Sequence, residues 1–482
     1  MSLKVLYAAS EALPFSKTGG LADVAHALPE ALAQSGANVR LVTPAYRGAL
    51  DRLREPLLRA TLTVCGQRFA VWEGHPAHER LRVWLIDCPS LYARDGTPYV
   101  DASGRDHADN AWRFGCFCEA VARLAMGEAC DWRADVLHLN DWQTGLAPLW
   151  LPRGDPSREA PRTLFTIHNL AYQGVFDRRE FDALGVGADL WHPDGIEFHG
   201  MGSFLKAGLT QCEWLTTVSP SYAREIQTPA FGHGLDGLLR HRRDRLCGIL
   251  NGIHEEHWDP QCDPYLPFRY GFATVKDGKR RNRLVLRTEL GLPDDERPLV
   301  GIVSRFAEQK GIDLLLAAAA EIRRLPLQFA ILGAGDAALE RRFEDWARSE
   351  PQQLAVRIGY DEGLAHRIEA GADMFLMPSR YEPCGLNQMY SQRYGTVPIV
   401  RRVGGLADSV IDATPDALAA HRATGIVFEH ADTGGVLYGL RRALELFGTP
   451  HWISMQDAGM RQDFSWRHTA AQYLEIYKAV RR

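Results

Sequence analysis

The sequence predicts an α/β protein made of two doubly wound, Rossmann-like domains that face a central cleft. Strand-like apolar runs alternate with helical stretches through the first half of the chain, and the same alternation restarts near residue 246. Such alternation is typical of a parallel sheet with helices on both faces. The length of 482 residues also exceeds what one hydrophobic core usually supports, so more than one domain is expected.

The first half begins with an apolar run at residues 3–10, which leads through a turn at Gly19 and Gly20 into a stretch with helical spacing. Further strands are predicted at residues 39–44, 81–87, 135–140, 162–169 and 214–219, and a helix at 108–129. Ligands of such sheets bind at the carboxyl ends of the strands. The polar residues at those ends are Ser10, Glu11, Asn140, Asp141, His168, Asn169 and Ser219. Each could instead cap the next helix, and for Ser219, which precedes a proline, we favour capping.

The second half repeats this organisation. A strand at 246–252 ends in a turn, and residues 254–280 show no clear period, as in a connector. Strands are then predicted at residues 298–305, 327–333, 356–360, 374–379 and 397–400, and an amphipathic helix at 463–482. We therefore predict a first domain at 1–245, a second at 246–460, and a final helix at 461–482 that crosses back to the first domain.

Composition excludes several classes of protein. The 55 Lys and Arg against 60 Asp and Glu give a net charge of −5, which argues against nucleic-acid binding. The nine cysteines form no Cys-x-x-Cys pair, so neither a disulfide framework nor a zinc site is indicated. The chain shows no signal-peptide pattern and no apolar run of about 18 residues, so we expect a cytoplasmic protein without a membrane partner.

The turn at residues 17–24 is a candidate anion site. Two glycines let a ligand approach the backbone, amides at a helix start attract anions, and Lys17 adds a positive charge. A phosphate or a sugar diphosphate fits this pattern, and so does a plain glycine-rich turn with a solvated lysine. The sequence Gly-Gly-Leu-Ala-Asp recurs at 404–408, where we interpret it as a tight turn.

Two segments that follow strands in the second half could also bind a sugar diphosphate. Arg305 and Lys310 offer a planar set of donors and a compact charge to phosphate oxygens, unless they only form a solvated basic loop. Glu382 lies in a glycine-containing turn, where a carboxylate can accept sugar hydroxyls. Cys384 beside it has no general base next to it in the sequence, so we interpret it as a packed thiol and not a nucleophile.

Over nearly its whole length the chain resembles bacterial glycogen synthases and plant starch synthases. The matching segments are residues 17–24 (Lys-Thr-Gly-Gly-Leu-Ala-Asp-Val), 166–174 (Thr-Ile-His-Asn-Leu-Ala-Tyr-Gln-Gly), 304–311 (Ser-Arg-Phe-Ala-Glu-Gln-Lys-Gly) and 382–386 (Glu-Pro-Cys-Gly-Leu). The resemblance implies a GT-B glycosyltransferase that transfers glucose from ADP-glucose to the non-reducing end of an α-1,4-glucan, with retention of configuration. It also implies that the reaction needs no metal and no cofactor, and that domain closure excludes water.

The resemblance also implies site residues. Those of the donor are Lys17, Gly19, Gly20, Asp23, Asn251, Arg305, Lys310, Tyr360, Cys384, Gly385 and Leu386. Tyr360 would stack on adenine, although a core tyrosine is the alternative. Glu382 would lie against the transferred glucose, His168 over the sugar ring, and Asp141 near glucose or acceptor hydroxyls. Retention is compatible with same-face attack assisted by the departing phosphate and with a covalent intermediate.

The chain departs from the family pattern at several positions. Asn140 and Gln143 replace both histidines of a His-Asp-Trp-His motif, so roles that need an imidazole there do not carry over. Asn387 stands where the family commonly has Thr, and His254 where it often has Asp.

Three other functions are compatible with parts of the sequence. The segment Gly333-Ala334-Gly335-Asp336 nearly satisfies a dinucleotide fingerprint and would suit an NAD-dependent oxidoreductase or epimerase. The second function is that of a non-catalytic glucan-binding protein, and the third is that of a related transferase that uses UDP-glucose or a different acceptor.

Overall fold

The protein is described here by a computed structural model that covers residues 2–76, 81–128, 131–152 and 160–481. The chain forms two compact units. One comprises Met1–Val218, Ala223–Gly252 and Trp466–Arg482, and the other comprises Ser219–Tyr222 and Ile253–Ser465. The predicted domain division at 245/246 and 460/461 lies a few residues before these boundaries.

The first unit is built on a nine-stranded sheet in the order β12-β11-β7-β6-β1-β2-β5-β4-β3. Its strands are β1 (Lys4–Ala8), β2 (Asn38–Pro44), β3 (Arg54–Val64), β4 (Gln67–His75), β5 (Arg82–Asp87), β6 (Val136–Asn140), β7 (Arg162–Ile167), β11 (Trp214–Thr217) and β12 (Leu246–Gly248). From β12 to β5 the pairs are parallel. A small sheet of β8 (Val175–Phe176), β10 (Met201–Ser203) and β9 (Glu197–Phe198) is attached.

One edge of the nine-stranded sheet differs from the prediction of parallel strands throughout. β4 runs antiparallel to β5, and β3 runs antiparallel to β4. The two residues of the hairpin turn, Cys65 and Gly66, both have positive φ, at 47° and 71°. Asn-Gly and Asp-Gly are the usual signature of such a turn, and this chain lacks both here. The first half of β3 is exposed and shows no apolar alternation, and only its end, residues 60–64, alternates apolar residues with threonine.

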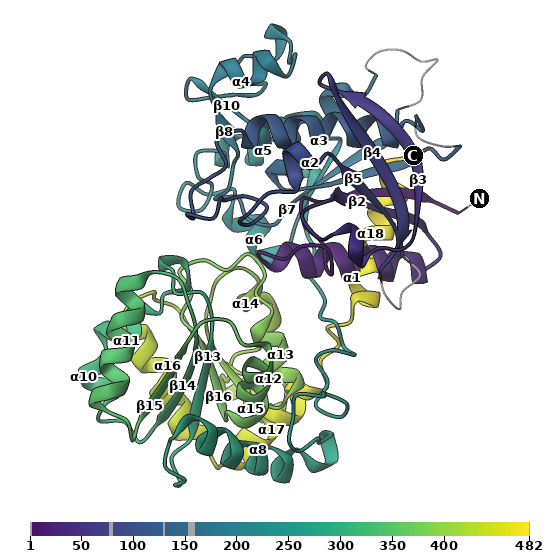
Figure 1. Cartoon of the computed structure of the whole chain (residues 1–482). Helices are drawn as coiled ribbons and strands as arrows, with labels where there is room; N and C mark the ends of the chain where they lie inside the picture. The colour runs from purple at the N-terminus through teal and green to yellow at the C-terminus, as the bar shows by residue number, and fades with distance from the viewer. Residues whose placement is uncertain (1, 77–80, 129–130, 153–159, 482) are drawn as a thin grey trace. The chain divides into compact units, whose positions relative to one another are not determined.

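The helices of the first unit are α1 (Gly20–Gln34), α2 (Pro89–Tyr92), α3 (Asn110–Ala125), α4 (Arg178–Ala183), α5 (Phe204–Gln211), α7 (Asp236–His241) and α18 (Trp466–Arg481), and α6 (Pro220–Glu225) belongs in part to each unit. The C-terminal helix α18 packs against α1 (Figure 1). Its buried Trp466, Tyr473 and Tyr477 join the core formed by β1, β2 and α1. The Tyr477 hydroxyl lies 2.7 Å from Nδ1 of the buried His138 on β6, which fixes the helix to the sheet.

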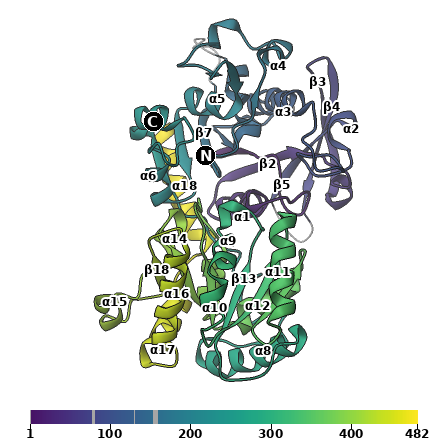
Figure 2. The ribbon, with the colours of Figure 1, turned by 90° about the vertical axis from the view of Figure 1, so that its left-hand side faces the viewer.

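The second unit is built on a six-stranded parallel sheet in the order β15-β14-β13-β16-β17-β18. Its strands are β13 (Leu299–Val303), β14 (Gln328–Gly333), β15 (Leu354–Ile358), β16 (Met374–Met377), β17 (Val397–Arg401) and β18 (Ile426–Phe428). Its helices are α8 (Val275–Leu290), α9 (Asp313–Ala317), α10 (Ala319–Ile322), α11 (Ala337–Ser349), α12 (Glu362–Gly371), α13 (Asn387–Arg393), α14 (Gly404–Ser409), α15 (Pro415–Ala419), α16 (Thr433–Leu446) and α17 (Pro450–Met460). Figure 2 shows α16 beside β18 at one side of this unit.

Short 3-10 turns complete both units: η1 (Leu50–Arg52), η2 (Trp142–Thr144), η3 (Ala147–Trp150), η4 (Ala188–Leu190), η5 (Arg243–Arg245), η6 (Phe272–Thr274) and η7 (Glu308–Lys310). Within the part of the chain that is described, no helix has both the length and the apolar character needed to span a membrane.

Both sheets share the strand order of a doubly wound Rossmann fold, which locates their ligand-binding edges. Counted along the chain, the order in the second unit is 3-2-1-4-5-6, and the first unit repeats it from β5 through β2, β1, β6 and β7 to β11. In such sheets the strand order reverses at the first strand, because the connections to its two sides run in opposite directions. Ligands bind at this switch point, beside the carboxyl ends of the strands. The switch points lie between β1 and β6 and between β13 and β16.

Candidate active site

The glycine-rich loop lies at the switch point of the first unit. β1 ends at Ala8, and the loop leads into α1, which begins at Gly20. No side chain caps the first turn of α1. A Cβ built on Gly20 would meet no atom within 4 Å, so the backbone faces open space there. An open, uncapped helix start with free amides is suited to an anion.

Two carboxylates organise this loop. The Lys17 ammonium lies 2.9 Å from Oδ1 of Asp23. Asp23 therefore holds Lys17 in place. The sequence predicted only that Asp23 belongs to the donor site, without this role. The Thr18 amide donates to Oε2 of Glu11 at 2.5 Å. Glu11 is buried, and desolvation raises the pKa of its carboxyl from 4.5 to about 7.

Asp141 follows β6 on the other side of the same switch point. Its φ is 55°, a left-handed conformation that is uncommon for a residue other than glycine. Its carboxylate accepts hydrogen bonds from the backbone amides of His168 at 2.7 Å and Asn169 at 3.4 Å. Desolvation raises the pKa of Asp141 to about 7, although the two amides oppose the rise. The fold thus brings Asp141 and His168 together, from the ends of the adjacent strands β6 and β7.

The neighbouring Asn140 fixes the tautomer of His168. Nδ2 of Asn140 donates to the carbonyl oxygen of Ala8 at 2.9 Å, which fixes the orientation of the amide because a carbonyl can only accept. Oδ1 of Asn140 therefore faces Nε2 of His168 at 2.8 Å, and that nitrogen must carry the hydrogen. Desolvation lowers the pKa of His168 to about 3, so the ring is neutral at pH 7 and its Nδ1 is an acceptor.

The switch point of the second unit gathers the other predicted charges. The chain leaves β13 through Arg305 to Lys310 on η7, and leaves β16 to reach Glu382. Nζ of Lys310 lies 2.6 Å from Oε2 of the buried Glu382, which also accepts a hydrogen bond from Ser379 at 3.0 Å. Arg305 joins the group through Gln309, whose Oε1 it contacts at 3.1 Å.

Backbone packing shapes the turn after Glu382. Gly385 has φ 71°, and Leu386 precedes α13, whose first turn has no side-chain cap. Cys384 is buried. Oγ of Ser219 donates to the carbonyl oxygen of Pro383 at 2.6 Å. The side chain of Asn387 donates to the carbonyl oxygen of Val303 at 2.7 Å, so it joins α13 to β13.

The second Gly-Gly-Leu-Ala-Asp segment explains the close packing of that turn. It opens the short helix α14 at Gly404. A Cβ on Gly404 would lie 2.0 Å from the carbonyl oxygen of Glu382, and one on Gly405 would lie 2.0 Å from that of Cys384. The two glycines are required for this approach, and the Gly405 amide supports the turn by donating to the Glu382 carbonyl at 3.1 Å. Sequence reasoning interpreted this segment only as a tight turn.

Two predicted donor residues follow edge strands and not the strands that border the switch points of their own sheets. Tyr360 follows β15, which is two strands from β13 in the sheet, and it is 78% exposed. The alternative of a core tyrosine is therefore wrong. Asn251 belongs to the first unit, where it is buried, and its Oδ1 has no hydrogen-bond partner among the described residues.

The fingerprint at 333–338 is used for packing and capping. A Cβ on Gly333 would lie 1.9 Å from the carbonyl oxygen of Ser304. The Asp336 carboxylate caps α11 by accepting from the amides of Ala338 and Leu339, at 2.7 and 3.0 Å. A negative charge therefore occupies the helix start where a dinucleotide would place its pyrophosphate.

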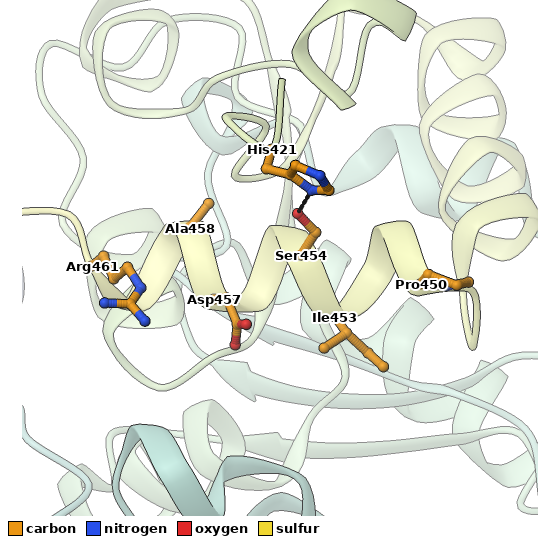
Figure 3. Close-up of a pocket in the computed structure, with 7 residues that line it drawn as sticks. All are labelled: His421, Pro450, Ile453, Ser454, Asp457, Ala458 and Arg461. Carbon is orange, nitrogen blue, oxygen red and sulfur yellow. Dashed lines mark hydrogen bonds between the residues drawn. The ribbon is translucent and has the colours of Figure 1, made fainter. Parts of the chain in front are cut away.

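A hollow of about 360 Å³ lies elsewhere in the second unit, on α17 (Figure 3). It is lined by His421, Pro450, Ile453, Ser454, Asp457, Ala458 and Arg461, and Nδ1 of His421 lies 2.9 Å from Oγ of Ser454. It contains none of the residues that the sequence singles out.

The sequence also matches models of known families. A model described as the starch synthase catalytic domain matches residues 4–241, and one described as glycosyl transferases group 1 matches residues 287–445. Glycogen synthase 1 of Methylococcus capsulatus is 49% identical over 479 residues, covering 99% of this chain and 96% of that protein. The glycogen synthase of Thioalkalivibrio sulfidiphilus is 48% identical and covers 99% of both.

Solved structures agree. The catalytic domain of starch synthase IV from Arabidopsis thaliana, bound to ADP and acarbose, has a TM-score of 0.89 and 33% identity over 100% of both chains. Sucrose-phosphate synthase from Thermosynechococcus elongatus shares the fold alone, with a TM-score of 0.59 and 19% identity over 99% of both chains. The predicted GT-B fold class is confirmed. The chain belongs to the glycogen and starch synthase family of glycosyltransferases.

Proposed function

We propose that the protein is a glycogen synthase, which transfers glucose from ADP-glucose to the non-reducing end of an α-1,4-glucan with retention of configuration. The observation that carries the proposal is the group formed by Arg305, Lys310 and Glu382 at the switch point of the second sheet. It occurs in a chain that is 49% identical to a glycogen synthase over almost its full length.

The cations of the site stabilise the leaving group. As the glycosidic bond to the diphosphate breaks, negative charge grows on the phosphate oxygens, and fixed positive charges there lower the barrier. We assign this role to Lys17 in the first unit and to Arg305 and Lys310 in the second. Gly19, Gly20, Gly385 and Leu386 supply backbone amides. Lys310 is held at 2.6 Å from Glu382, so its ammonium is already in place when phosphate binds.

The polar groups at the strand ends orient the glucose. Glu382, fixed by Lys310 and Ser379, accepts hydrogen bonds from sugar hydroxyls. Asp141 does the same from the first unit. His168 is neutral and donates its Nε2 hydrogen to Oδ1 of Asn140. It therefore offers two acceptors to the sugar, its Nδ1 and its backbone carbonyl oxygen.

We assign binding of the nucleotide base to the exposed Tyr360, whose ring stacks on adenine. Asn251, Asp23 and Cys384 complete the donor site, Asp23 through Lys17. We assign residues 1–245 to the acceptor side and residues 246–460 to nucleotide-sugar binding. The protein works in the cytoplasm on ADP-glucose and a glucan, without nucleic acid or membrane as partner.

Two labelled donors test the proposal. Purified protein is incubated with glycogen and either ADP-[14C]glucose or UDP-[14C]glucose at equal concentration, without NAD. We expect label in the polymer with ADP-glucose and much less with UDP-glucose, together with stoichiometric release of ADP. Preferential use of UDP-glucose would assign the donor to the other nucleotide. Binding of glycogen without ADP release would indicate a non-catalytic glucan-binding protein.

A further inference from the structure

A cluster of two histidines and a glutamate joins the segment 253–265 of the second unit to helix α12. The cluster consists of His257, Glu362 and His366, and one ligand atom of each lies within 4.8 Å of the others. Nε2 of His257 is 3.1 Å from Oε1 of Glu362, and Nε2 of His366 is 3.7 Å from the same oxygen. Glu362 and His366 are four residues apart on α12, so they share a face of the helix.

The surroundings of this cluster orient one histidine for metal binding. Nδ1 of His366 lies 2.8 Å from Oδ2 of the buried Asp263, which also accepts from the Tyr394 hydroxyl at 2.6 Å. The His366 ring therefore donates its Nδ1 hydrogen to a carboxylate. This arrangement is the usual support of a metal-binding histidine, because it leaves Nε2 with a free lone pair.

Nε2 of His366 is itself unsatisfied. His366 is 0% exposed, and among the described residues this nitrogen has no hydrogen bond of 3.5 Å or less, since Oε1 of Glu362 lies 3.7 Å away. A buried polar atom without a partner is costly and needs an explanation, which can be an ion. Ring packing also fixes its direction, since Trp258 stacks on His366 with centroids 3.7 Å apart at 10°. Tyr390 in turn stacks on Trp258 at 3.8 Å.

We propose that His257, Glu362 and His366 bind a divalent transition-metal ion of the Zn²⁺ type, with water as a fourth ligand. Tetrahedral Zn²⁺ with ligands at about 2.0–2.1 Å requires ligand atoms about 3.3 Å apart. The pairs at 3.1 and 3.7 Å bracket this value. The two carboxylates of Glu362 and Asp263 balance the charge of the ion. The side chain of His257 is 44% exposed, which leaves an open position for water.

The alternative is an ion pair without metal, in which a protonated His366 bridges Asp263 and Glu362. Burial opposes the charged ring, but the two carboxylates outweigh it and raise the pKa of His366. The 3.7 Å separation between Nε2 of His366 and Oε1 of Glu362 is within the range of an ion pair but longer than a normal hydrogen bond. The two explanations differ in one observable, since only the first predicts stoichiometric metal binding.

The site contains none of the residues assigned to ADP-glucose or the glucan, so it is separate from the proposed transfer reaction. Its position still suggests what it does. Glu362 begins α12, two residues after Tyr360. An ion held by Glu362, His366 and His257 would join the segment 253–265 to the start of this helix and restrict the motion of the residue assigned to adenine.

Metal titration of the full-length protein tests the proposal. The protein is treated with EDTA, freed of chelator, and titrated with Zn²⁺ by calorimetry and with Co²⁺ by visible absorption. We expect wild-type protein to bind one more Zn²⁺ per chain than His257→Ala or Glu362→Gln, and to show the intense d–d bands of tetrahedral Co²⁺. Zn²⁺ should raise the Tm of the wild-type protein and not that of either variant. His451→Ala, which removes an exposed histidine on α17, should behave as wild type.

Two results would overturn the proposal. One is the absence of saturable Zn²⁺ binding and of tetrahedral Co²⁺ bands in wild-type protein, a measurement that does not depend on the folding of any variant. The other is equal stoichiometry and affinity in wild-type protein and in His257→Ala, whose exposed side chain can be removed without opening the core.

Discussion

Replacing Lys310 by methionine tests the ion pair on which the second half of the site is built. The change leaves the Glu382 carboxylate, whose side chain is 6% exposed, without its cation at 2.6 Å. Breaking a buried pair by removing one partner costs about 3–5 kcal/mol. Because Ser379 still donates to Glu382 and Lys310 is 19% exposed, we expect a loss at or just below the lower end of that range, about 2–3 kcal/mol.

Scanning calorimetry measures this loss. For a unit of this size, about 2–3 kcal/mol corresponds to a decrease of roughly 5–10 °C in the Tm of its transition. The double variant Lys310→Met/Glu382→Gln should recover at least half of the decrease, because the buried charge is gone. Arg348→Ala is the control, since it breaks an exposed pair with Asp345 and should shift Tm by less than about 1 °C.

Activity should separate from stability in the same variants. Both Lys310→Met and the double variant lack the cation that stabilises the departing diphosphate, so kcat with ADP-glucose should decrease by a factor of about 10²–10³ in Lys310→Met and by at least as much in the double variant, which also loses the Glu382 carboxylate. A Lys310→Met protein with wild-type Tm would show that Glu382 is not buried as a charge. A double variant with wild-type kcat would show that Lys310 does not contact the leaving group.

Three further changes test other parts of the site and the fold. Lys17→Ala should lower kcat/KM for ADP-glucose at least about tenfold. It should leave Tm unchanged, because the ion pair of Lys17 with Asp23 is partly exposed and such pairs contribute less than about 1 kcal/mol. Unchanged kinetics would show that Lys17 is only a solvated side chain. Since burial raises the pKa of Glu11 from 4.5 to about 7, its ionisation destabilises the wild-type protein increasingly from pH 4.5 to 7 and fully above it. Glu11→Gln should therefore exceed wild type in Tm at pH 8 and approach it at pH 4.5, and a lower Tm at pH 8 would contradict the reasoning. Tyr477→Phe removes the hydroxyl that is the hydrogen-bond partner of Nδ1 of the buried His138. The free energy of unfolding, measured in urea, should decrease by about 1–3 kcal/mol. A decrease near zero would show that this hydrogen bond does not fix α18.

The parallel core of each unit could be predicted because its strands carry a strong local signal. β1, β6 and β13 are short apolar runs followed by turns, and the structure places them where the alternating pattern does. The hairpin of β3 and β4 was missed, because the first half of β3 is exposed, its apolar alternation is confined to residues 60–64, and its turn lacks the usual residues.

Some features of the site depend on tertiary contacts that no local pattern contains. The tautomer of His168 follows from Asn140 and the Ala8 carbonyl, which meet only when β1, β6 and β7 pair. The proposed metal-binding cluster likewise joins His257 to residues more than one hundred positions later. In contrast, the pairing of Lys310 with Glu382 could be predicted in part, because both follow strands that border the same switch point.

The structure of the labelled product tests the central claim most directly. Glycogen extended with ADP-[14C]glucose is digested with β-amylase, which releases maltose only from non-reducing ends linked by α-1,4 bonds. If the protein transfers glucose with retention to those ends, nearly all of the incorporated label should be released as maltose. Label that stays in the polymer after exhaustive digestion, or no incorporation at all, would contradict the account.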